Sequence, residues 1–503
     1  MARLIEAVER RPQAAFAIFL TVHFGLWTAL PALLYLNLPL DLIEALTYGR
    51  EWQLGYDKLP PLPWWMVEVT HRLFGIDIAY YALAQLTVIA AFVLVWQTAR
   101  PLVGAVGALA AILIIDGMHY FNFTAAKFNH DVIQLPFWAL AGFAFHAALR
   151  RGALGYWSLL GVALGLALWA KYFVVVLAAP LLLFLLADPE ARRKLLGPGP
   201  WIAAGVALAV AAPHLVWLMQ NDFLPFRYAD ARALPVRGAL DHLIHPASFL
   251  GGQLFFALPA LAIAAPLVWP WPSAKPSRTE APRAAQADAF DRRIVTLLAF
   301  GPALTLLALT LVTGRGTVTM WGYPLWLFLG LWIVMVAPAQ AAGARLARLG
   351  VLWAIVFAVL VLAFIADYAV LPNFDRRYRA AFFPGDRLSA AIVQRFEQAT
   401  GRQPAYIIAS MWDGGNVAHY SHESPQPRVL IDGLPRRAPW IDMADLRAKG
   451  AAIVWTNHDP RVLPDGFAAV APGAEVGAPF DLPYRRGEGA VHVGWAILRP
   501  QAP

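Results

Sequence analysis

Long, uninterrupted apolar runs alternate with short polar segments along the first three quarters of this sequence. A helix needs about 20 mostly apolar residues to cross the hydrocarbon core of a bilayer. By that measure, the pattern predicts about eleven transmembrane helices. They are expected near 12–36, 77–97, 102–118, 131–149, 154–170, 172–187, 200–219, 247–269, 294–313, 321–338 and 350–371.

The pattern changes after residue 371, where the apolar runs shorten to the length of strands. Three such runs are Ala405–Ala409, Arg428–Ile431 and Ala452–Trp455. A helix is predicted over Asp386–Thr400, before the first of them. Strands that alternate with helices and Gly/Pro turns are typical of an α/β domain. The sequence therefore predicts a mainly helical, polytopic membrane domain over residues 1–371 and a small α/β domain over residues 372–503.

The basic residues predict the orientation of this chain, because Lys and Arg concentrate in cytoplasmic loops. With the N-terminus inside, each basic cluster falls on the cytoplasmic side. The clusters are Arg3, Arg10 and Arg11; Arg100; Arg150 and Arg151; Arg192, Arg193 and Lys194; Lys275, Arg278, Arg283, Arg292 and Arg293; and Arg345 and Arg348. The segment 270–293 is then a cytoplasmic linker. The outer, periplasmic side receives the α/β domain and the loops 37–76, 119–130, 220–246 and 314–320.

Composition agrees with a membrane protein, since 59% of the residues are hydrophobic and only 14% are charged. The net charge of +8 is explained by the cytoplasmic loops, so it does not indicate nucleic acid as a partner. The chain has no cysteine, which excludes disulfides and thiolate chemistry. The first apolar run is too long for the core of a removable signal peptide.

The polar segment Asp41–Trp65 is the richest candidate for chemistry, with four carboxylates and two cations. Asp41 and Glu44 lie three residues apart, so a helix would place both carboxylates on one face. A partly desolvated carboxylate at the membrane surface suits a general base. The alternative is that both are solvated interfacial acids or cap the next helix.

The same segment continues as Gly55–Leu62, which contains Tyr56, Asp57 and Lys58 before a Pro-Pro step. Two prolines predict an extended turn that directs the side chains before it. Lys58 is then a candidate point charge for a phosphate. Alternatively, Lys58 reaches lipid headgroups or pairs with Asp57.

The second outer loop adds Lys127, Asn129 and Asp131 just before an apolar helix. Asp131 is either a second catalytic carboxylate or an acid that is stabilised by the helix N-terminus. Lys171 lies between two apolar runs, where a charge is costly unless it faces an outer cavity or a headgroup.

Other polar residues form a possible outer rim. They are His214 near the end of the seventh predicted span, Arg227 and Tyr228 after it, and Arg315 in a short loop. A lone histidine is usually structural, and Arg315 suits either an anion or membrane anchoring. Asp241, His242 and His245 have loose metal-ligand spacing without a zinc signature. The segment Met411–Asn416, with His419 and Tyr420, is either a loop that faces a sugar or acceptor or, more simply, a turn.

These motifs resemble the superfamily of dolichyl-phosphate-mannose–protein mannosyltransferases, particularly its bacterial family-39-like members. The resemblance rests on motifs that occur in order along more than half of the chain. They are Asp41, Glu44, Gly49–Trp52, Gly55–Leu62, Lys127–Asn129 with Pro136 and Trp138, Ala170–Tyr172, Pro213–Trp217 with Asp222 and Phe223, Phe226–Tyr228, and Trp321–Pro324. Transferases that attach aminoarabinose or galacturonic acid to lipopolysaccharide share this plan.

The resemblance implies a type-C glycosyltransferase fold and an inverting transfer from a polyprenyl-phosphate sugar. Asp41 would be the base or would orient the acceptor, and Glu44 would support it. Lys58 would hold the donor phosphate, aided by Arg227 or Arg315. Asp131 matches an acid of the lipopolysaccharide-modifying relatives, although many members have Asn there, and Leu59 replaces the usual His.

The expected function is therefore transfer of a hexosyl or pentosyl group to lipid A or core oligosaccharide, with Tyr56, Asp57, Lys127, Asn129, Lys171, His214 and Tyr228 near the substrates. No cofactor is assigned. A divalent cation stays open, because some relatives have a metal-binding acid at the position of Asp57. Alternatives are protein O-glycosylation and lipid or sugar transport. Transport is disfavoured because the ionisable residues gather at the outer interface rather than at the midplane.

Overall fold

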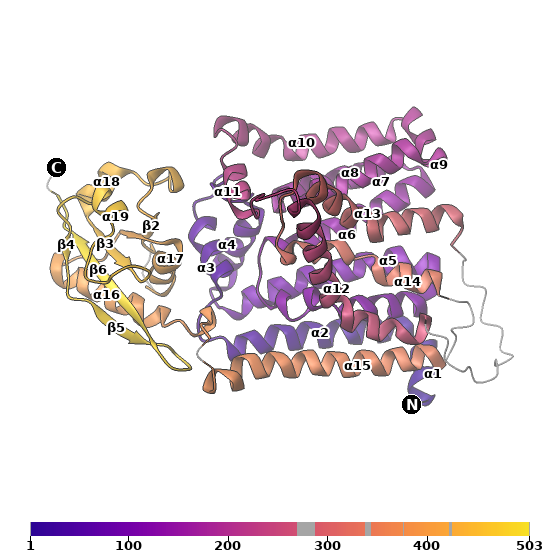
Figure 1. The fold of residues 1–503 in the computed structure, drawn as a ribbon, viewed down its shortest axis with the longest axis horizontal. Coiled ribbons are helices and arrows are strands. Elements are labelled where there is room, and N and C mark those ends of the chain that lie inside the picture. The colour runs from indigo at the N-terminus through magenta and orange to yellow at the C-terminus, as the bar shows by residue number, and fades with distance from the viewer. Residues whose placement is uncertain (1, 269–286, 338–343, 376, 422–424, 502–503) are drawn as a thin grey trace. The chain divides into compact units, whose positions relative to one another are not determined.

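The computed structural model describes residues 2–268, 287–337, 344–375, 377–421 and 425–501 (Figure 1). Most of the predicted linker 270–293 therefore lies outside the described residues. The chain divides into two compact units. The helical unit comprises Met1–Ala29, Lys58–Pro60 and Tyr81–Ala363, and the sheet unit comprises Leu30–Asp57, Pro61–Tyr80 and Phe364–Pro503. The segment around Asp41 thus belongs to the unit that contains the C-terminal sheet.

Long apolar helices form the helical unit, and several of them run in nearly the same direction (Figure 1). Its helices begin with α1 Ala2–Arg10, α2 Pro12–Leu34, α5 Ile78–Asp116, α6 His130–Arg151, α7 Leu154–Ala170, α8 Val175–Ala187, α9 Pro189–Arg192 and α10 Gly199–Gln220. They continue with α11 Leu224–Arg232, α12 Asp241–Val268, α13 Ala289–Thr313, α14 Leu329–Val336 and α15 Ala344–Ile365.

Among the described residues, seven helices are long and apolar enough to cross a membrane, or up to nine if two bent pairs each count as one span. The predicted number of eleven is therefore not confirmed. Two predicted spans merge into α5, which is kinked at Gly104, where φ is 72°. The segment Leu154–Ala170 is apolar but has only 17 residues. A multi-pass membrane protein is nevertheless confirmed.

Glycines let α7 and α10 approach each other closely. A β-carbon on Gly161 would lie 2.4 Å from the backbone oxygen of Ala203, and one on Gly165 would lie 2.7 Å from the side chain of Val210. Two small residues four apart on a membrane helix favour this kind of packing, because van der Waals contact replaces the hydrophobic effect in lipid. We conclude that the GxxxG spacing in α7 determines this helix pair.

The sheet unit contains a six-stranded mixed sheet with the order β2-β1-β3-β6-β4, and β5 pairs with β6. The strands are β1 Tyr406–Ala409, β2 Arg428–Ile431, β3 Ala451–Trp455, β4 Glu475–Val476, β5 Phe480–Pro483 and β6 Ala490–Leu498. The strands β2, β1 and β3 are parallel, with Ile407 opposite Val429 and Ala452, whereas β6 is antiparallel to β3.

Helices surround this sheet and extend the unit. They are α3 Leu40–Gly49, α4 Leu62–Phe74, α16 Gly385–Thr400, α17 Met411–Tyr420, α18 Met443–Lys449 and α19 Asp465–Val470. The three predicted strands and the predicted helix before them are confirmed, with ends that differ by one residue at most. The segment Met411–Asn416, however, is neither a loop nor a turn, because it forms the first part of α17.

Two glycines explain why α17 fits between the sheet and α3. A β-carbon on Gly414 would lie 2.6 Å from the side chain of Val429 in β2, and one on Gly415 would lie 2.5 Å from the hydroxyl of Thr47 in α3. Ser410 caps the helix, since its hydroxyl accepts a hydrogen bond from the backbone N–H of Asp413 at 3.0 Å. This helix therefore fastens the segment around Asp41 to the sheet.

Candidate functional site

In the sheet unit, α3 carries the two carboxylates that the sequence singles out. Asp41 lies in the first turn of the helix, and Glu44 follows one turn later. Asp41 is half-buried, whereas Glu44 is only 4% exposed. The helix that the spacing of the two residues requires is therefore present. Their catalytic roles stay predictions.

An aromatic core fixes the chain after α3. The ring of Tyr48 stacks on Trp64 with centroids 4.4 Å apart, and Tyr56 meets the same indole edge-on at 4.7 Å. Trp440 closes this core against both tyrosines. The Tyr56 hydroxyl donates to the backbone oxygen of Tyr48 at 2.8 Å, and burial raises the pKa of Tyr56 well above its ordinary value. Tyr56, a predicted substrate contact, is therefore buried in this structure.

Asp57 has protein partners for both carboxylate oxygens. The Arg437 Nε donates to one oxygen at 2.7 Å, and the Tyr48 hydroxyl donates to the other at 3.0 Å. Arg437 also pairs with Asp432, just after β2. A divalent cation needs several converging oxygen ligands. Because Asp57 is already engaged by a guanidinium and a phenol, its surroundings do not fit a metal.

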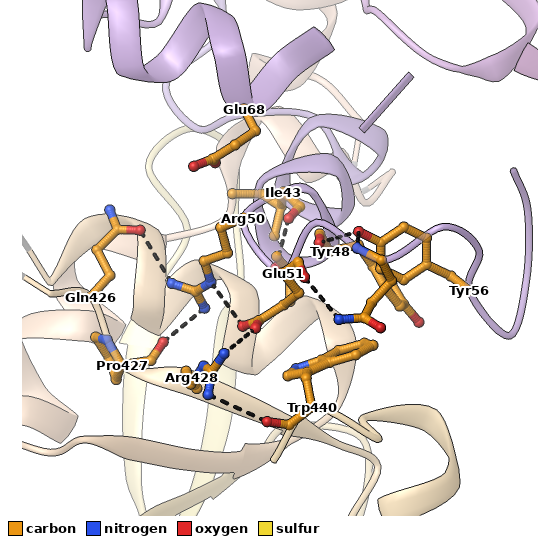
Figure 2. Close-up of polar contacts among 12 residues, drawn as sticks. Ile43, Tyr48, Arg50, Glu51, Tyr56, Glu68, Gln426, Pro427, Arg428 and Trp440 are labelled. Carbon is orange, nitrogen blue, oxygen red and sulfur yellow. Dashed lines mark hydrogen bonds and ion pairs between the residues drawn. The ribbon is translucent and has the colours of Figure 1, made fainter. Parts of the chain in front are cut away.

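A second guanidinium network joins the end of α3 to β2 (Figure 2). Arg50 donates to the backbone oxygen of Pro427 at 2.7 Å and to the side chain of Gln426 at 3.3 Å. Glu51 accepts from Arg428 at 2.6 Å and lies 3.8 Å from Arg50. Burial raises the pKa of Glu51, while the two arginines act in the opposite direction. The network therefore ties Arg50 and Glu51 to residues more than 370 positions later in the chain.

In the helical unit, Lys58 lies beside Tyr228, and the neighbouring Pro60 contacts His130 at the end of the segment 119–130. The Lys58 ammonium lies 5.2 Å from the centroid of the Tyr228 ring, within cation–π range. The buried His130 contacts the backbone oxygen of Pro60 through Nε2 at 3.2 Å. Pro61 has helical dihedral angles and caps α4, so the Pro-Pro step is not extended throughout, contrary to the prediction.

Asp131 and Lys171 form a buried ion pair in the same unit. Their oxygen and nitrogen are 2.5 Å apart, and neither residue is more than 9% exposed. Gln134 donates to the same carboxylate oxygen at 3.1 Å. The ammonium also lies 5.5 Å from the ring centroid of Trp321. Lys171 thus avoids the cost of an isolated charge by pairing with Asp131.

The N-terminus of α6 explains how Asp131 is held. The side chain of Asn129 accepts hydrogen bonds from the backbone N–H groups of Asp131 and Val132, both at 3.0 Å. Asn129 is therefore the N-cap of α6, and Asp131 lies in the first turn, where a carboxylate is favoured. The predicted helix-terminal position is correct, and the ion pair with Lys171 adds a second contact that the sequence did not reveal.

The other residues of the predicted outer rim have different surroundings. His214 is buried and contacts the Tyr172 hydroxyl at 2.9 Å, and Lys127 is half-buried. Arg227 is exposed on α11, and Arg315 pairs with Asp230 at 2.7 Å.

His242 and His245, whose spacing loosely resembles that of metal ligands, form hydrogen bonds to backbone oxygens through Nδ1. His242 contacts Leu311 at 2.8 Å, and His245 contacts Gly314 at 2.7 Å. Among the residues that the structure describes, no group of three or more His, Cys, Asp or Glu side chains is placed to hold a metal.

Both units contain buried or paired charged residues that the sequence did not indicate as candidates. Arg428 and Arg437 carry no local signal, because their partners are about 380 positions away. In the helical unit, His23 and Asp116 form a fully buried pair at 2.9 Å, and the Trp353 indole donates to the same aspartate. The sequence could have predicted this pair from the ionisable residues within the predicted spans 12–36 and 102–118, because such residues are rare in membrane helices and usually have a partner.

The apolar helices of the helical unit are those of a multi-pass integral membrane protein. Residues 58–217 match the family model described as dolichyl-phosphate-mannose-protein mannosyltransferase. The resemblance seen in the sequence is thereby confirmed over residues 58–217.

Individual relatives agree with this assignment. The lipopolysaccharide core galacturonosyltransferase RgtA of Rhizobium johnstonii is 26% identical over 99% of this chain and 100% of its own length. The lipid A galacturonosyltransferase RgtD of the same organism is 28% identical over 42% of this chain and 46% of its own length. The crystal structure of ArnT from Cupriavidus metallidurans bound to undecaprenyl phosphate has a TM-score of 0.61 at 14% identity, covering 96% of this chain and 98% of ArnT. At that identity, the likeness to ArnT shows the fold alone.

Proposed function

We propose that the protein is an inverting membrane glycosyltransferase that moves a sugar from a polyprenyl-phosphate donor to lipopolysaccharide. The observation that carries the proposal is the full-length relationship to a lipopolysaccharide core galacturonosyltransferase. The likeness to the fold of ArnT supports it, because the two chains correspond over nearly their whole length. The active side is proposed to be the periplasmic face of a bacterial inner membrane.

The transferred group is proposed to be a hexuronic acid. Two relatives that match this chain are named as galacturonosyltransferases, one for the core and one for lipid A. Protein O-glycosylation, which the description of the family model suggests, has weaker support because the model matches only residues 58–217. The acceptor is therefore assigned to lipid A or core oligosaccharide.

In the proposed reaction, an acceptor hydroxyl attacks the anomeric carbon while the bond from that carbon to the phosphate oxygen breaks. The acceptor proton passes to a carboxylate, and the electron pair of the broken bond leaves with polyprenyl phosphate. A phosphate leaving group needs charge neutralisation more than protonation, because it departs as a stable anion. We assign the neutralising charge to Lys58.

The carboxylate that receives the proton is assigned to Asp41, with Glu44 in support. Asp131 is a weaker candidate for the base, because its carboxylate already accepts from both Lys171 and Gln134. We assign Asp131 and Lys171 to a fixed pair that organises the second outer loop. Asp41 and Lys58 belong to different units, so each role needs its own variant.

The test is sugar transfer by the purified full-length protein, with undecaprenyl-phosphate galacturonic acid as donor and lipid A or core oligosaccharide as acceptor. We expect Lys58→Ala and Asp41→Asn each to lower kcat by about 10²- to 10³-fold, because each removes a group that stabilises the transition state. The matched control is Arg192→Ala, which removes an exposed cation from α9 and leaves the rate unchanged.

Each outcome separates the parts of the proposal. Full activity of Asp41→Asn would reject Asp41 as the base and direct attention to Asp131. Transfer of a neutral hexose in preference to galacturonic acid would reject the hexuronic acid donor but keep the reaction class. A wild-type protein that binds none of the polyprenyl-phosphate sugars would contradict the proposed function itself.

A further inference from the structure

The α/β domain contains a cavity of about 310 Å³ that the proposed transfer reaction does not use. Its polar lining comes from the ends of the three parallel strands. Ser410 follows β1, Asp432 follows β2, and Asn457 and His458 follow β3. Because the carboxyl ends of parallel strands meet at one edge of a sheet, residues from three distant stretches converge there. This edge is where open α/β sheets bind ligands.

The walls of the cavity combine aromatic and hydrogen-bonding surfaces. Trp455 and Phe467 supply apolar surface, together with Pro464. Asn457 and His458 are exposed at the same cavity, so their polar groups are available to a ligand from solvent. A pyranose ring presents C–H groups on its faces and hydroxyls around its edge. Aromatic side chains next to amide and carboxylate groups suit both surfaces.

The charge of the cavity disfavours an acidic ligand. Asp413 lines it but is 1% exposed, and its two oxygens accept from Thr456 at 2.8 Å and Ser410 at 2.9 Å. Asp432 is more open, with 39% of its side chain exposed. Arg437 pairs with Asp432 and offsets its charge, but the described residues that line the cavity include no lysine or arginine to bind the carboxylate of a uronic acid, whereas Asp432 can still accept a hydrogen bond from a hydroxyl or amino group. A neutral sugar or an amino sugar therefore fits better than the proposed transferred group.

Asp432 also connects the cavity to the segment around Asp41. Its backbone has a φ of 53°, a conformation that non-glycine residues rarely adopt and that the surroundings must hold in place. Arg437 contacts Asp432 and also donates to Asp57 at 2.7 Å. Asp57 directly precedes Lys58 in the sequence. The wall of the cavity thus shares one arginine with the segment to which the proposed catalytic residues belong.

We propose that this cavity is a glycan-binding subsite that takes a neutral or amino-sugar residue of the acceptor. Asn457, His458 and Asp432 hold the hydroxyl or amino groups, and the half-buried Pro464, with the small exposed parts of Trp455 and Phe467, supplies the apolar contact to the ring. The inference rests on the proposed function, because the acceptor is the lipopolysaccharide of that reaction. It assigns recognition of the acceptor, at a distance from the transferred sugar, to the α/β domain.

The experiment compares the full-length wild type with Asn457→Ala/His458→Ala, both in detergent. Both side chains are exposed, so their removal leaves the core of the domain intact. The direct measurement is saturation-transfer NMR with core oligosaccharide released from lipopolysaccharide, and oligogalacturonide serves as an acidic comparator. The matched control is Arg461→Ala, an exposed residue of the same loop region that does not line the cavity.

We expect the core oligosaccharide to bind wild type and Arg461→Ala equally and the double variant about tenfold more weakly, because two hydrogen bonds are lost. In the transfer assay, the acceptor KM should rise by a similar factor while kcat and the donor KM stay unchanged. Equal binding by the double variant, or stronger binding of oligogalacturonide, would overturn the subsite. If no donor supports transfer but the oligosaccharide still binds in this pattern, the proposed reaction fails and the binding site stands.

Discussion

Asp131 in the helical unit pairs with Lys171, and both side chains are nearly buried. Glu51 in the sheet unit has two arginine neighbours, and the side chain of Arg428 is 45% exposed. The first arrangement removes both charges from water and compensates them with one short ion pair, hydrogen bonds and aromatic rings. The second shares the buried Glu51 carboxylate, whose side chain is 2% exposed, between Arg50 and Arg428, and Arg428 is the partly hydrated partner. The cost of losing a partner should therefore differ between the two units.

The same contrast appears at other positions. His23 and Asp116 form a pair in the helical unit with exposures of 0% and 1% for the two side chains. In the sheet unit, Arg437 binds both Asp57 and Asp432 and keeps about a quarter of its side chain exposed. A membrane interior offers no water to solvate a lone charge, so charges there need specific partners. A domain in water can use arginines as shared connectors.

The largest stability effect should follow when the buried pair in the helical unit is broken. Lys171→Met leaves the Asp131 carboxylate without its cation, and we expect a loss of about 3–5 kcal/mol of stability. Thermal unfolding of the full-length protein in detergent measures this effect. The double variant Asp131→Leu/Lys171→Met is the control, because it removes both charges and should recover most of the loss. Equal destabilisation of the single and double variants would show that the pair is not what stabilises this region.

A smaller effect should appear at the buried aspartate of the sheet unit. Burial raises the pKa of Asp413 from 3.8 to about 6, although hydrogen bonds from Thr456 and Ser410 oppose the shift. A carboxyl whose pKa is raised by folding stabilises the folded state fully below pH 3.8, and this contribution is lost as the pH rises through 6. We expect a loss of about 2 kcal/mol between pH 4 and pH 7.

The variant Asp413→Asn tests this pH dependence, because the amide does not ionise and still accepts one of the two hydrogen bonds. The stability of the variant should change less between pH 4 and pH 7 than that of wild type, by about the same 2 kcal/mol. Unfolding of the full-length protein at both pH values provides the measurement. Parallel pH profiles for the two proteins would exclude Asp413 as the responsible group.

The smallest of these effects should come from the network around Glu51, because Arg50 and the partly hydrated Arg428 share its charge. Glu51→Gln removes the charge between Arg50 and Arg428 but keeps a side chain of the same shape, so we expect a local loss of about 1–2 kcal/mol. Hydrogen exchange of residues 38–57 should become faster, while exchange in α6 stays unchanged. Arg436→Ala, an exposed arginine next to Arg437, is the matched control. A loss as large as that of Lys171→Met would contradict the contrast between the two units.

The sequence by itself determined the membrane-spanning character, the first three strands with their preceding helix, and the resemblance to the mannosyltransferase superfamily. These features depend on local patterns, namely apolar run length, strand-length runs between turns, and ordered motifs. The predicted number of eleven spans is not confirmed among the described residues, because the apolar stretches on either side of Arg100 continue as one kinked helix and Leu154–Ala170 is short. The strands β4, β5 and β6 were not predicted, although the alternation of apolar and polar residues in Ala490–Leu498 indicates a strand at β6.

Only the tertiary structure decided which distant residues meet. The pairing of Lys171 with Asp131 spans 40 positions, and those of Arg428 with Glu51 and Arg437 with Asp57 span about 380. It also placed the segment around Asp41 in the unit that contains the C-terminal sheet. Local propensity cannot encode such contacts, because the position of a charged residue in the sequence does not identify the distant residue that pairs with it when it is buried. That partner is determined by the packing of helices and strands, which brings the two groups together only in the folded chain.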